Sequence, residues 1–232
     1  KNAGPTIPLV GDAKHIFEDF EKEEFSGDYQ EWLDCLNEYR RTMSKRRNPN
    51  PAYVDPAEFI MRLSAKMQED GIYVADVGQN QIWSCGYVKV RKGKFLTSGG
   101  MGTMGYSIPA AMGAKVADPK RQVVAVCGDG SFQMSMMELA TMCQHDIPVK
   151  IVVLKNQYLG MVREYQHFTY KEKYSVVDLS GSPDLEKLSS AYGIPFLRLE
   201  NMEKCDETIE AFLKEDSSML MECLVDPMDI VR

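Results

Sequence analysis

The chain has 232 residues, of which 44% are hydrophobic, so it can bury one substantial core and still leave length for a linker. Its 27 basic and 34 acidic residues give a net charge of −7, which argues against binding to nucleic-acid phosphates or anionic lipid. The six cysteines form no C-x-x-C pair, and no leader pattern or long apolar run is present. We therefore expect reduced, mostly buried thiols in a cytoplasmic protein.

The first fifty residues are expected to lie outside the main domain. The segment IPLVGDAKHIFEDFEKE predicts a short strand, a turn and an amphipathic helix, and residues 1–20 are interpreted as the end of a preceding central domain. Residues 21–51 are rich in charge and predict a linker with one helix near 29–43. The basic run that ends this stretch favours a solvated linker over a nucleic-acid site.

Residues 52–232 show a regular alternation of elements. Asp55, Pro56 and Glu58 form a helix-start pattern, and the helix they begin is expected to end before Gly71. Five apolar strands follow, and the predicted helices among them lie near 104–117, 134–145, 184–192 and 203–214; the strands are IYVADVG, QVVAVCGDG, PVKIVVLKN, PFLRLE and MLMECLVD. This order predicts an α/β fold with an open, mainly parallel sheet and helices on both faces.

Polar residues follow two consecutive strands at the points where each strand ends. Asp129 follows the strand QVVAVCG directly, and Asn156 follows the strand IVVLK directly. The residues between Gly130 and Asn156 suffice for one helix and the return strand. Neighbouring strands lie about 5 Å apart, so the two side chains can reach one ion if these strands pair. A carboxylate and an amide oxygen without imidazole or thiolate favour Mg²⁺ that takes phosphate oxygens as further ligands.

The residues around Asp129 suit a diphosphate. Gly128 and Gly130 permit close backbone approach, and Ser131 offers a hydroxyl. A helix expected to start near Phe132 would turn its N–H groups toward the same anion. A GDGS sequence alone is typical of an ordinary strand-to-helix turn, and the asparagine at the end of the next strand is what favours the metal site.

Two other classes of protein are alternatives to this metal site. Gly100 to Gly105 fits G-x-G-x-x-G after a possible strand, KFLTS, which is a weak signal for a nucleotide-binding dehydrogenase of Rossmann type. That interpretation gives no reason for the two glycines beside Asp129 or for Asn156. A non-catalytic module with a vestigial site is the third class, and the intact Asp129, Gly130 and Asn156 argue against it.

Longer segments resemble a known family. GDGS followed by N resembles the diphosphate motif of thiamine-diphosphate enzymes. DVGQNQIWS, LTSGGMGTMGYSIPAAMGAK, GDGSFQMSMMELATMCQHDIPVKIVVLKNQYLGMV and AYGIP resemble the carboxyl-terminal domain of acetolactate synthase (acetohydroxyacid synthase) large subunits. The resemblance covers residues 52 to 232 and implies a domain that binds Mg²⁺ and thiamine diphosphate.

The resemblance assigns roles by motif. Asp129, Asn156 and the backbone carbonyl of Tyr158 would bind the metal. Met104 would support the bent cofactor from beneath, and Met134 and Met161 would flank its aminopyrimidine and thiazolium side. The remaining cofactor-binding residues would line the diphosphate: Gln79, Asn80, Gly102, Gly128, Gly130, Ser131, Leu159 and Gly160.

Three positions depart from the family pattern. Asn80 stands where a histidine is usual, which keeps a donor and removes a titratable group. Lys155 replaces a more usual asparagine and is expected to change a strand-end contact only. Tyr165 stands where a tryptophan favours 2-ketobutyrate as acceptor, so we expect a weak 2-ketobutyrate preference here.

The implied reaction is the decarboxylative condensation of pyruvate with a second 2-keto acid, in branched-chain amino-acid biosynthesis or an acetoin route. The activating glutamate would come from the amino-terminal pyrimidine domain of a neighbouring subunit, and FAD would sit on a central domain of the full-length enzyme. We expect no catalytic residue in this chain, no role for Glu138 as a replacement, and an inactive chain by itself. A homo-oligomer such as a dimer, and a possible regulatory subunit, are implied; other thiamine-diphosphate decarboxylases and carboligases share this site and stay open as alternatives.

The stretch from Leu159 to Ser182 shows no sustained periodicity and follows the last metal ligand. Such a segment can close over a bound ligand and exclude water, so we expect it to be mobile without cofactor. His167 within it is interpreted as a surface-loop histidine.

Overall fold

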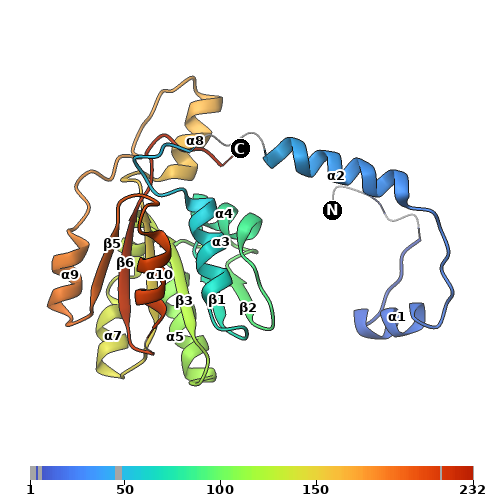
Figure 1. Cartoon of the computed structure of the whole chain (residues 1–232), viewed down its shortest axis with the longest axis horizontal. Coiled ribbons are helices and arrows are strands. Elements are labelled where there is room, and N and C mark those ends of the chain that lie inside the picture. Colours follow the sequence, from blue (N-terminus) through green and yellow to red (C-terminus); the bar gives the residue numbers. More distant parts are fainter. Residues whose placement is uncertain (1–3, 5–6, 45–48, 215, 232) are drawn as a thin grey trace. The chain divides into compact units, whose positions relative to one another are not determined.

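The structure is a computed structural model and describes residues 4, 7–44, 49–214 and 216–231. It divides into two compact units, residues 1–48 and 49–232 (Figure 1). The first unit contains α1 (Ala13–Phe20) and α2 (Gln30–Ser44), which confirms both helices expected there. The short strand expected at residues 7–10 is not formed, and residues 45–48 of the basic run lie outside the described residues.

The second unit is built on a six-stranded sheet with all strands parallel. The strand order is β2-β1-β3-β4-β6-β5, which confirms the predicted open α/β fold. The strands are β1 (Ile72–Ala75), β2 (Lys94–Thr97), β3 (Val123–Gly128), β4 (Lys150–Lys155), β5 (Phe196–Leu199) and β6 (Met219–Leu224).

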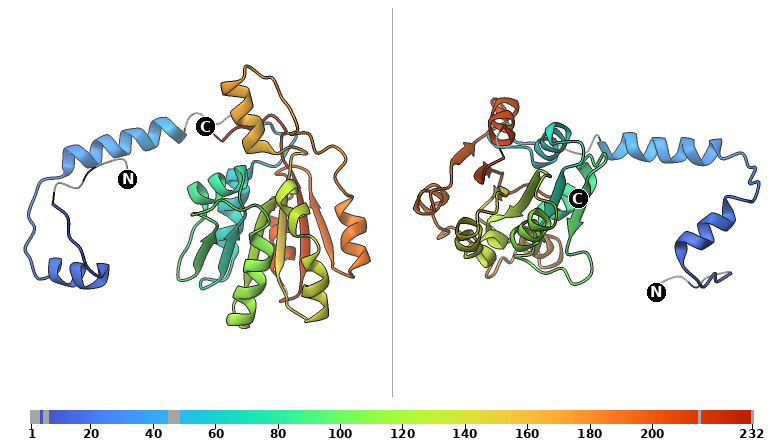
Figure 2. Two further views of the ribbon diagram at one scale, coloured as in Figure 1. Left: turned by 180° about the vertical axis from the view of Figure 1, so that it is seen from behind. Right: turned by 90° about the horizontal axis from the view of Figure 1, so that it is seen from below.

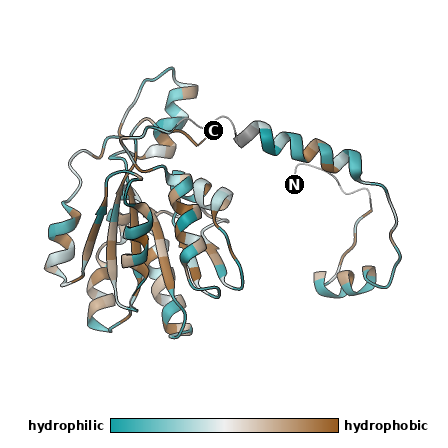
Figure 3. Ribbon diagram, in the orientation of Figure 1, coloured by the Kyte–Doolittle hydropathy of each residue, from teal (hydrophilic) through white to brown (hydrophobic). Residues whose placement is uncertain are grey.

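Helices cover both faces of the sheet (Figures 1 and 2). One face packs against α3 (Pro56–Lys66), α4 (Gln79–Tyr87) and α10 (Cys205–Leu213). The other packs against α5 (Ser107–Ala117), α6 (Asp129–Ser135), α7 (Glu138–Gln144) and α9 (Leu185–Ala191). Because both faces are covered, the central strands are apolar between their ends, and Figure 3 shows them as mostly hydrophobic ribbon.

Several element boundaries differ from the prediction. The helix expected near 134–145 is two helices, and α6 begins at Asp129 rather than near Phe132. The helix expected near 104–117 begins at Ser107, because Gly105 adopts a left-handed φ of 82° just before it. The helix α4 was not predicted, whereas β2 coincides with KFLTS, which the sequence indicated only as a possible strand.

The stretch after Asn156 was expected to be irregular, and that expectation is wrong for α8 (Gly160–Thr169). His167 lies on this helix, half-buried, with its Nδ1 2.9 Å from the hydroxyl of Tyr174. The loop that follows returns to the site, where the N–H of Leu159 donates to the carbonyl of Val177. Closure of the segment over a ligand stays a prediction.

All six cysteines are free thiols. Cys127, Cys205 and Cys223 are buried and the other three are exposed, so the expectation of mostly buried thiols holds for half of them. Within the described residues, every helix is too short or too polar to cross a membrane.

Candidate functional site

A cavity of about 190 Å³ opens at the carboxyl ends of β1, β3 and β4. The chain leaves β1 toward the edge strand β2 and returns to β3 on the other side of β1. Ligands of open α/β sheets bind at such switch points, beyond the carboxyl ends of the strands. The lining residues are Val77, Gly78, Gln79, Asn80, Trp83, Gly102, Met104, Gly128, Asp129, Gly130, Ser131, Leu154, Asn156, Tyr158, Leu159, Gly160, Met161, Val162 and Val225.

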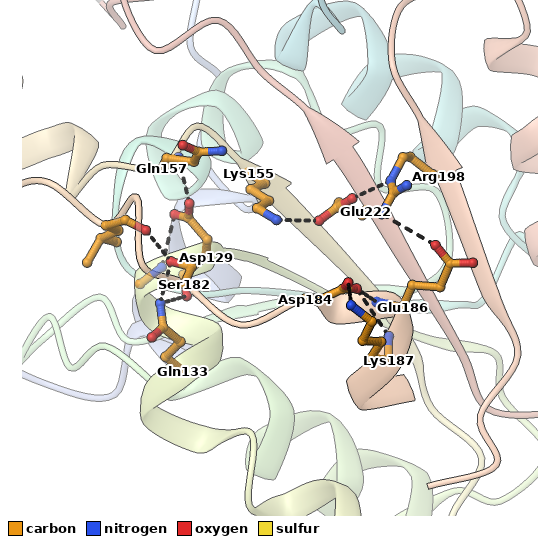
Figure 4. A network of polar contacts seen from close by, with 12 residues as sticks. Asp129, Gln133, Lys155, Gln157, Ser182, Asp184, Glu186, Lys187, Arg198 and Glu222 are labelled. Carbon is orange, nitrogen blue, oxygen red and sulfur yellow. Dashed lines mark hydrogen bonds and ion pairs between the residues drawn. The ribbon is translucent and has the colours of Figure 1, made fainter. Parts of the chain in front are cut away.

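Asp129 is the first residue of α6, directly after β3, and only 3% of its surface is exposed. Its two carboxylate oxygens accept backbone N–H groups, Oδ1 from Gly130 at 3.0 Å and Oδ2 from Gln157 at 2.7 Å (Figure 4). Burial raises the pKa of Asp129 to about 6, because the charged form loses water, and these N–H groups offset part of that effect. A cation in the cavity would favour the ionised form.

In the metal-free chain, the free energy of unfolding of Asp129→Asn relative to that of the wild type is expected to be ~1–2 kcal/mol higher at about pH 7.5 than at about pH 4.5, since only the wild type has to bury a charge at the higher pH. In the wild type, the folded pKa of about 6 lies above the ordinary value of an aspartate. The contribution of protonated Asp129 to the free energy of unfolding is therefore complete below about pH 4 and is lost as pH rises through 6. Urea denaturation in EDTA should show a smaller advantage at about pH 4.5, with exposed Asp70→Asn as control. An equal advantage at both pH values would contradict the burial cost.

Asn156 lies beside Asp129 because β3 and β4 are paired, with Gly128 opposite Leu154. Asn156 is 8% exposed, and its Oδ1 accepts the N–H of Tyr158 at 3.0 Å. Gln157, between Asn156 and Tyr158 in the sequence, adopts a left-handed φ of 61°, which is rare for a residue with a side chain. This conformation turns the loop back over Asp129, where the N–H of Gln157 donates to the carboxylate. The pairing therefore brings both sequence-predicted side-chain ligands to one cavity, with Tyr158 also in its wall.

The cavity also exposes backbone donors. The helices α4 and α8 begin at its rim, with Gly78 and Leu159 at their N-caps, and neither cap has a side-chain hydrogen bond. Apart from the N–H of Gln81, which donates to the carbonyl of Gly78, their first N–H groups are therefore open to an anion. A Cβ on Gly130 would lie 2.7 Å from Leu159 Cδ2, so a side chain here would require the leucine side chain to move.

Most residues that the resemblance assigns to the cofactor line the cavity. Those placed there are Gln79, Asn80, Gly102, Met104, Gly128, Gly130, Ser131, Leu159, Gly160 and Met161. Met134 is not among them: it is 56% exposed and packs against Gly105. Tyr165 is 55% exposed on α8 and makes an edge contact with Tyr170, so it does not line this cavity either. Met134 and Tyr165 could contact a cofactor or substrate only if another chain or domain extended the cavity toward them.

Two predicted polar contacts are already used by the fold. Asn80 donates both N–H groups of its amide to backbone carbonyls, those of Asp76 at 2.9 Å and Val126 at 3.1 Å. Ser131 donates its hydroxyl to the carbonyl of Val77 at 2.9 Å. Asn80 thus ties the ends of β1 and β3 together, and a diphosphate contact through its N–H groups would break those bonds.

Lys155, the departure at the end of β4, makes the strand-end contact that was expected. Its Nζ lies 2.7 Å from Oε1 of Glu222, which is 1% exposed, and Arg198 Nε donates to the other oxygen at 2.6 Å (Figure 4). Burial is the main influence on the pKa of Asp129 and raises it, while the positive charge of Lys155 acts in the opposite direction.

Sequence reasoning missed two residues. Asp76, fully buried at the end of β1, accepts the N–H groups of Val77, Gly105 and Ser107 at 2.7–2.9 Å. An acid directly after an apolar strand was a signal available in the sequence. Glu164 on α8 is 6% exposed and contacts Gln79, and no local pattern indicates this.

The dehydrogenase alternative does not fit the topology. Gly100 to Gly105 follows β2, which is the edge strand of the sheet, whereas a dinucleotide fingerprint belongs in the turn after a central strand. Within the described residues no group of three His, Cys, Asp or Glu side chains could hold a metal ion unaided.

Comparison with known proteins decides the family. Residues 76–223 match the family model described as thiamine pyrophosphate enzyme, C-terminal TPP binding domain. The chain belongs to this thiamine pyrophosphate enzyme family. The match begins at Asp76 and includes every residue that lines the cavity except Val225, so the cavity belongs to the thiamine pyrophosphate (TPP) binding domain.

Relatives of this TPP-binding domain include acetolactate synthase large subunits. That of Porphyra purpurea is 34% identical over 97% of this chain and 39% of its own length, and that of Lactococcus lactis subsp. lactis is 34% identical over 94% and 38%. A probable acetolactate synthase large subunit of Methanocaldococcus jannaschii is 34% identical over 99% and 40%. The chain spans about two fifths of the length of these relatives.

Proposed function

We propose that this TPP-binding domain holds thiamine diphosphate through Mg²⁺ and forms the carboxyl-terminal part of an acetolactate synthase-like enzyme. The observation that carries the proposal is the meeting of Asp129 and Asn156 in one buried cavity at the carboxyl ends of β3 and β4. The family match and the similarity to acetolactate synthase large subunits support the cofactor and the reaction class.

The residues present fit the group. A carboxylate, an amide oxygen and the carbonyl of Tyr158 are hard oxygen donors, which suit Mg²⁺ and leave positions for phosphate oxygens. The uncapped starts of α4 and α8 supply N–H groups for the same diphosphate. Gly130 and Gly160 keep the walls free of side chains where backbone must approach closely.

When bound, thiamine diphosphate supplies the carbon nucleophile that adds to a 2-keto acid. The chain's own residues bind, orient and shield it. Asp129 provides the one negative charge among the lining side chains of the described residues, and Met104, Leu159 and Met161 form an apolar wall that excludes water. The substrates proposed are pyruvate and a second 2-keto acid.

The rest of the proposed enzyme follows from the resemblance to acetolactate synthase. An amino-terminal pyrimidine domain from a neighbouring subunit would complete the site in a homo-oligomer, and FAD would belong to a central domain. The exposed position of Tyr165 leaves the acceptor preference dependent on that second wall.

A complete subunit that contains this chain is expected to form acetolactate from pyruvate with Mg²⁺ and thiamine diphosphate, whereas the 232-residue chain alone is expected to form none. Asp129 is the one acid among the described lining residues and is assigned to the metal, so no acid remains there to activate the cofactor. Colorimetric detection of acetoin after acid decarboxylation of the product provides the measurement. Activity of the isolated chain would contradict the split site, and inactivity of the complete subunit would overturn the proposed reaction.

A further inference from the structure

The side-chain amide of Gln79 connects one proposed metal ligand to groups outside the metal site. Its Oε1 accepts the Nδ2–H of Asn156 at 3.1 Å. Its Nε2 donates to Oε2 of Glu164 at 3.1 Å and to the backbone carbonyl of Asp229 at 3.1 Å. Gln79, Asn156 and Glu164 are 5%, 8% and 6% exposed, so these bonds are shielded from water.

The acceptors Glu164 and Asp229 determine which atom is the donor in each hydrogen bond of this network. A carboxylate and a carbonyl can only accept, so the nitrogen of Gln79 must face Glu164 and Asp229. The oxygen of Gln79 then faces Asn156, which must present its own nitrogen there. The Oδ1 of Asn156 is consequently the atom left for the cavity side, where it accepts the N–H of Tyr158 at 3.0 Å.

Packing holds Gln79 in this place. A Cβ on Gly160 would overlap Oε1 of Gln79 and would lie 2.8 Å from Nδ2 of Asn156. The start of α8 therefore leaves room for the paired amides only while residue 160 is glycine. Both N–H groups of the Gln79 amide are used, so Gln79 has no side-chain donor left for a diphosphate.

We propose that Gln79 is a positioning residue, which fixes the Asn156 amide so that its oxygen faces the metal, and that Glu164 in turn fixes Gln79. This inference rests on the proposed function, because it concerns the same Mg²⁺ and thiamine diphosphate site. It differs from the role that the resemblance implies for Gln79, namely direct contact with the diphosphate.

The first test is a double-mutant cycle on the 232-residue chain. Gln79→Met removes the polar atoms at similar volume, and Gln81→Met on the same helix, where Gln81 donates to Thr97 Oγ1, is the matched control. We expect Gln79→Met to raise the Mn²⁺ concentration needed for half-maximal thiamine diphosphate binding by roughly tenfold, since groups that orient metal ligands have effects of about that size. In an Asn156→Ala background, Gln79→Met should change this Mn²⁺ concentration by less than about twofold.

Direct contact between Gln79 and the diphosphate would give a different result. The tenfold loss would then persist in the Asn156→Ala background, and this would overturn the positioning role. An unchanged Mn²⁺ requirement in Gln79→Met would overturn it as well. If the wild-type chain bound no thiamine diphosphate with Mn²⁺, the proposed function would fail, and the second test would still decide on the positioning role.

The second test needs no cofactor. In ¹⁵N–¹H spectra, the side-chain NH₂ signals of Asn156 should shift and exchange faster with water in Gln79→Met, Glu164→Ala and Gly160→Ala. Gln166→Ala on α8, which loses only bonds to Ser175, is the control for Glu164→Ala. Unchanged Asn156 signals in all three variants, with the backbone spectrum still that of a folded chain, would contradict the proposed chain of bonds.

Discussion

Asp129→Ala and Asn156→Ala are each expected to weaken Mg²⁺-dependent binding of thiamine diphosphate by roughly 100-fold or more. Each removes one of the few protein oxygens that can bind the cation, and the cation is what joins the diphosphate to the protein. Asp129 has the larger expected effect because it supplies the negative charge. Isothermal titration calorimetry with thiamine diphosphate at saturating Mg²⁺ measures the change.

Glu138→Ala is the matched control for these variants. Glu138 is a half-buried acid at the start of α7 and does not line the cavity, so its loss should leave cofactor binding unchanged. Circular dichroism should show that all three variants remain folded. Wild-type affinity in Asp129→Ala would remove Asp129 from the metal site.

Asp76→Ala is expected to lower the free energy of unfolding by ~3–5 kcal/mol, the largest loss we expect from any single polar substitution here. The carboxylate is fully buried and accepts three backbone N–H groups, which would be left without a partner. Two of these groups belong to Gly105 and Ser107, so the loop carrying Met104 and the start of α5 would lose their anchor. Urea denaturation measures the loss.

Asp70→Ala is the control for Asp76→Ala, since Asp70 is exposed at the turn before β1. Its loss should change the free energy of unfolding by less than about 0.5 kcal/mol. A loss under about 1 kcal/mol for Asp76→Ala would mean that the three N–H groups find water or other acceptors instead.

The sequence was sufficient to predict the parallel sheet and the meeting of Asp129 and Asn156 at its carboxyl edge. The central strands β3 and β4 are continuous apolar runs apart from the lysines at the two ends of β4, because both sheet faces are covered, and Asp129 and Asn156 each follow a strand directly. The split between α6 and α7 was not predictable, because MSMMELATM has the composition of one helix and its break at Met136 and Met137 has no glycine or proline. Short β2 was indicated only as a possible strand, KFLTS, because it lacks a long apolar run, and it is only partly buried.

The polar contacts of the cavity were less predictable than its residues. Gln79 and Glu164 are 85 positions apart and meet only after α4 and α8 are placed on the same side of the sheet ends. The motif indicated that Gln79 belongs to the site but not that both its N–H groups are used within the protein. For Tyr165, position in the motif did not reveal that its helix face points away from the cavity.

The most direct test of the account is calorimetric titration of the wild-type chain with thiamine diphosphate, with Mg²⁺ and with EDTA. A diphosphate placed beside the buried carboxylate of Asp129 would be repelled without a cation between them. We expect saturable binding with Mg²⁺ and a loss of measurable heat in EDTA. Equal binding in EDTA would contradict a site in which Asp129 and Asn156 hold the cofactor through a metal ion.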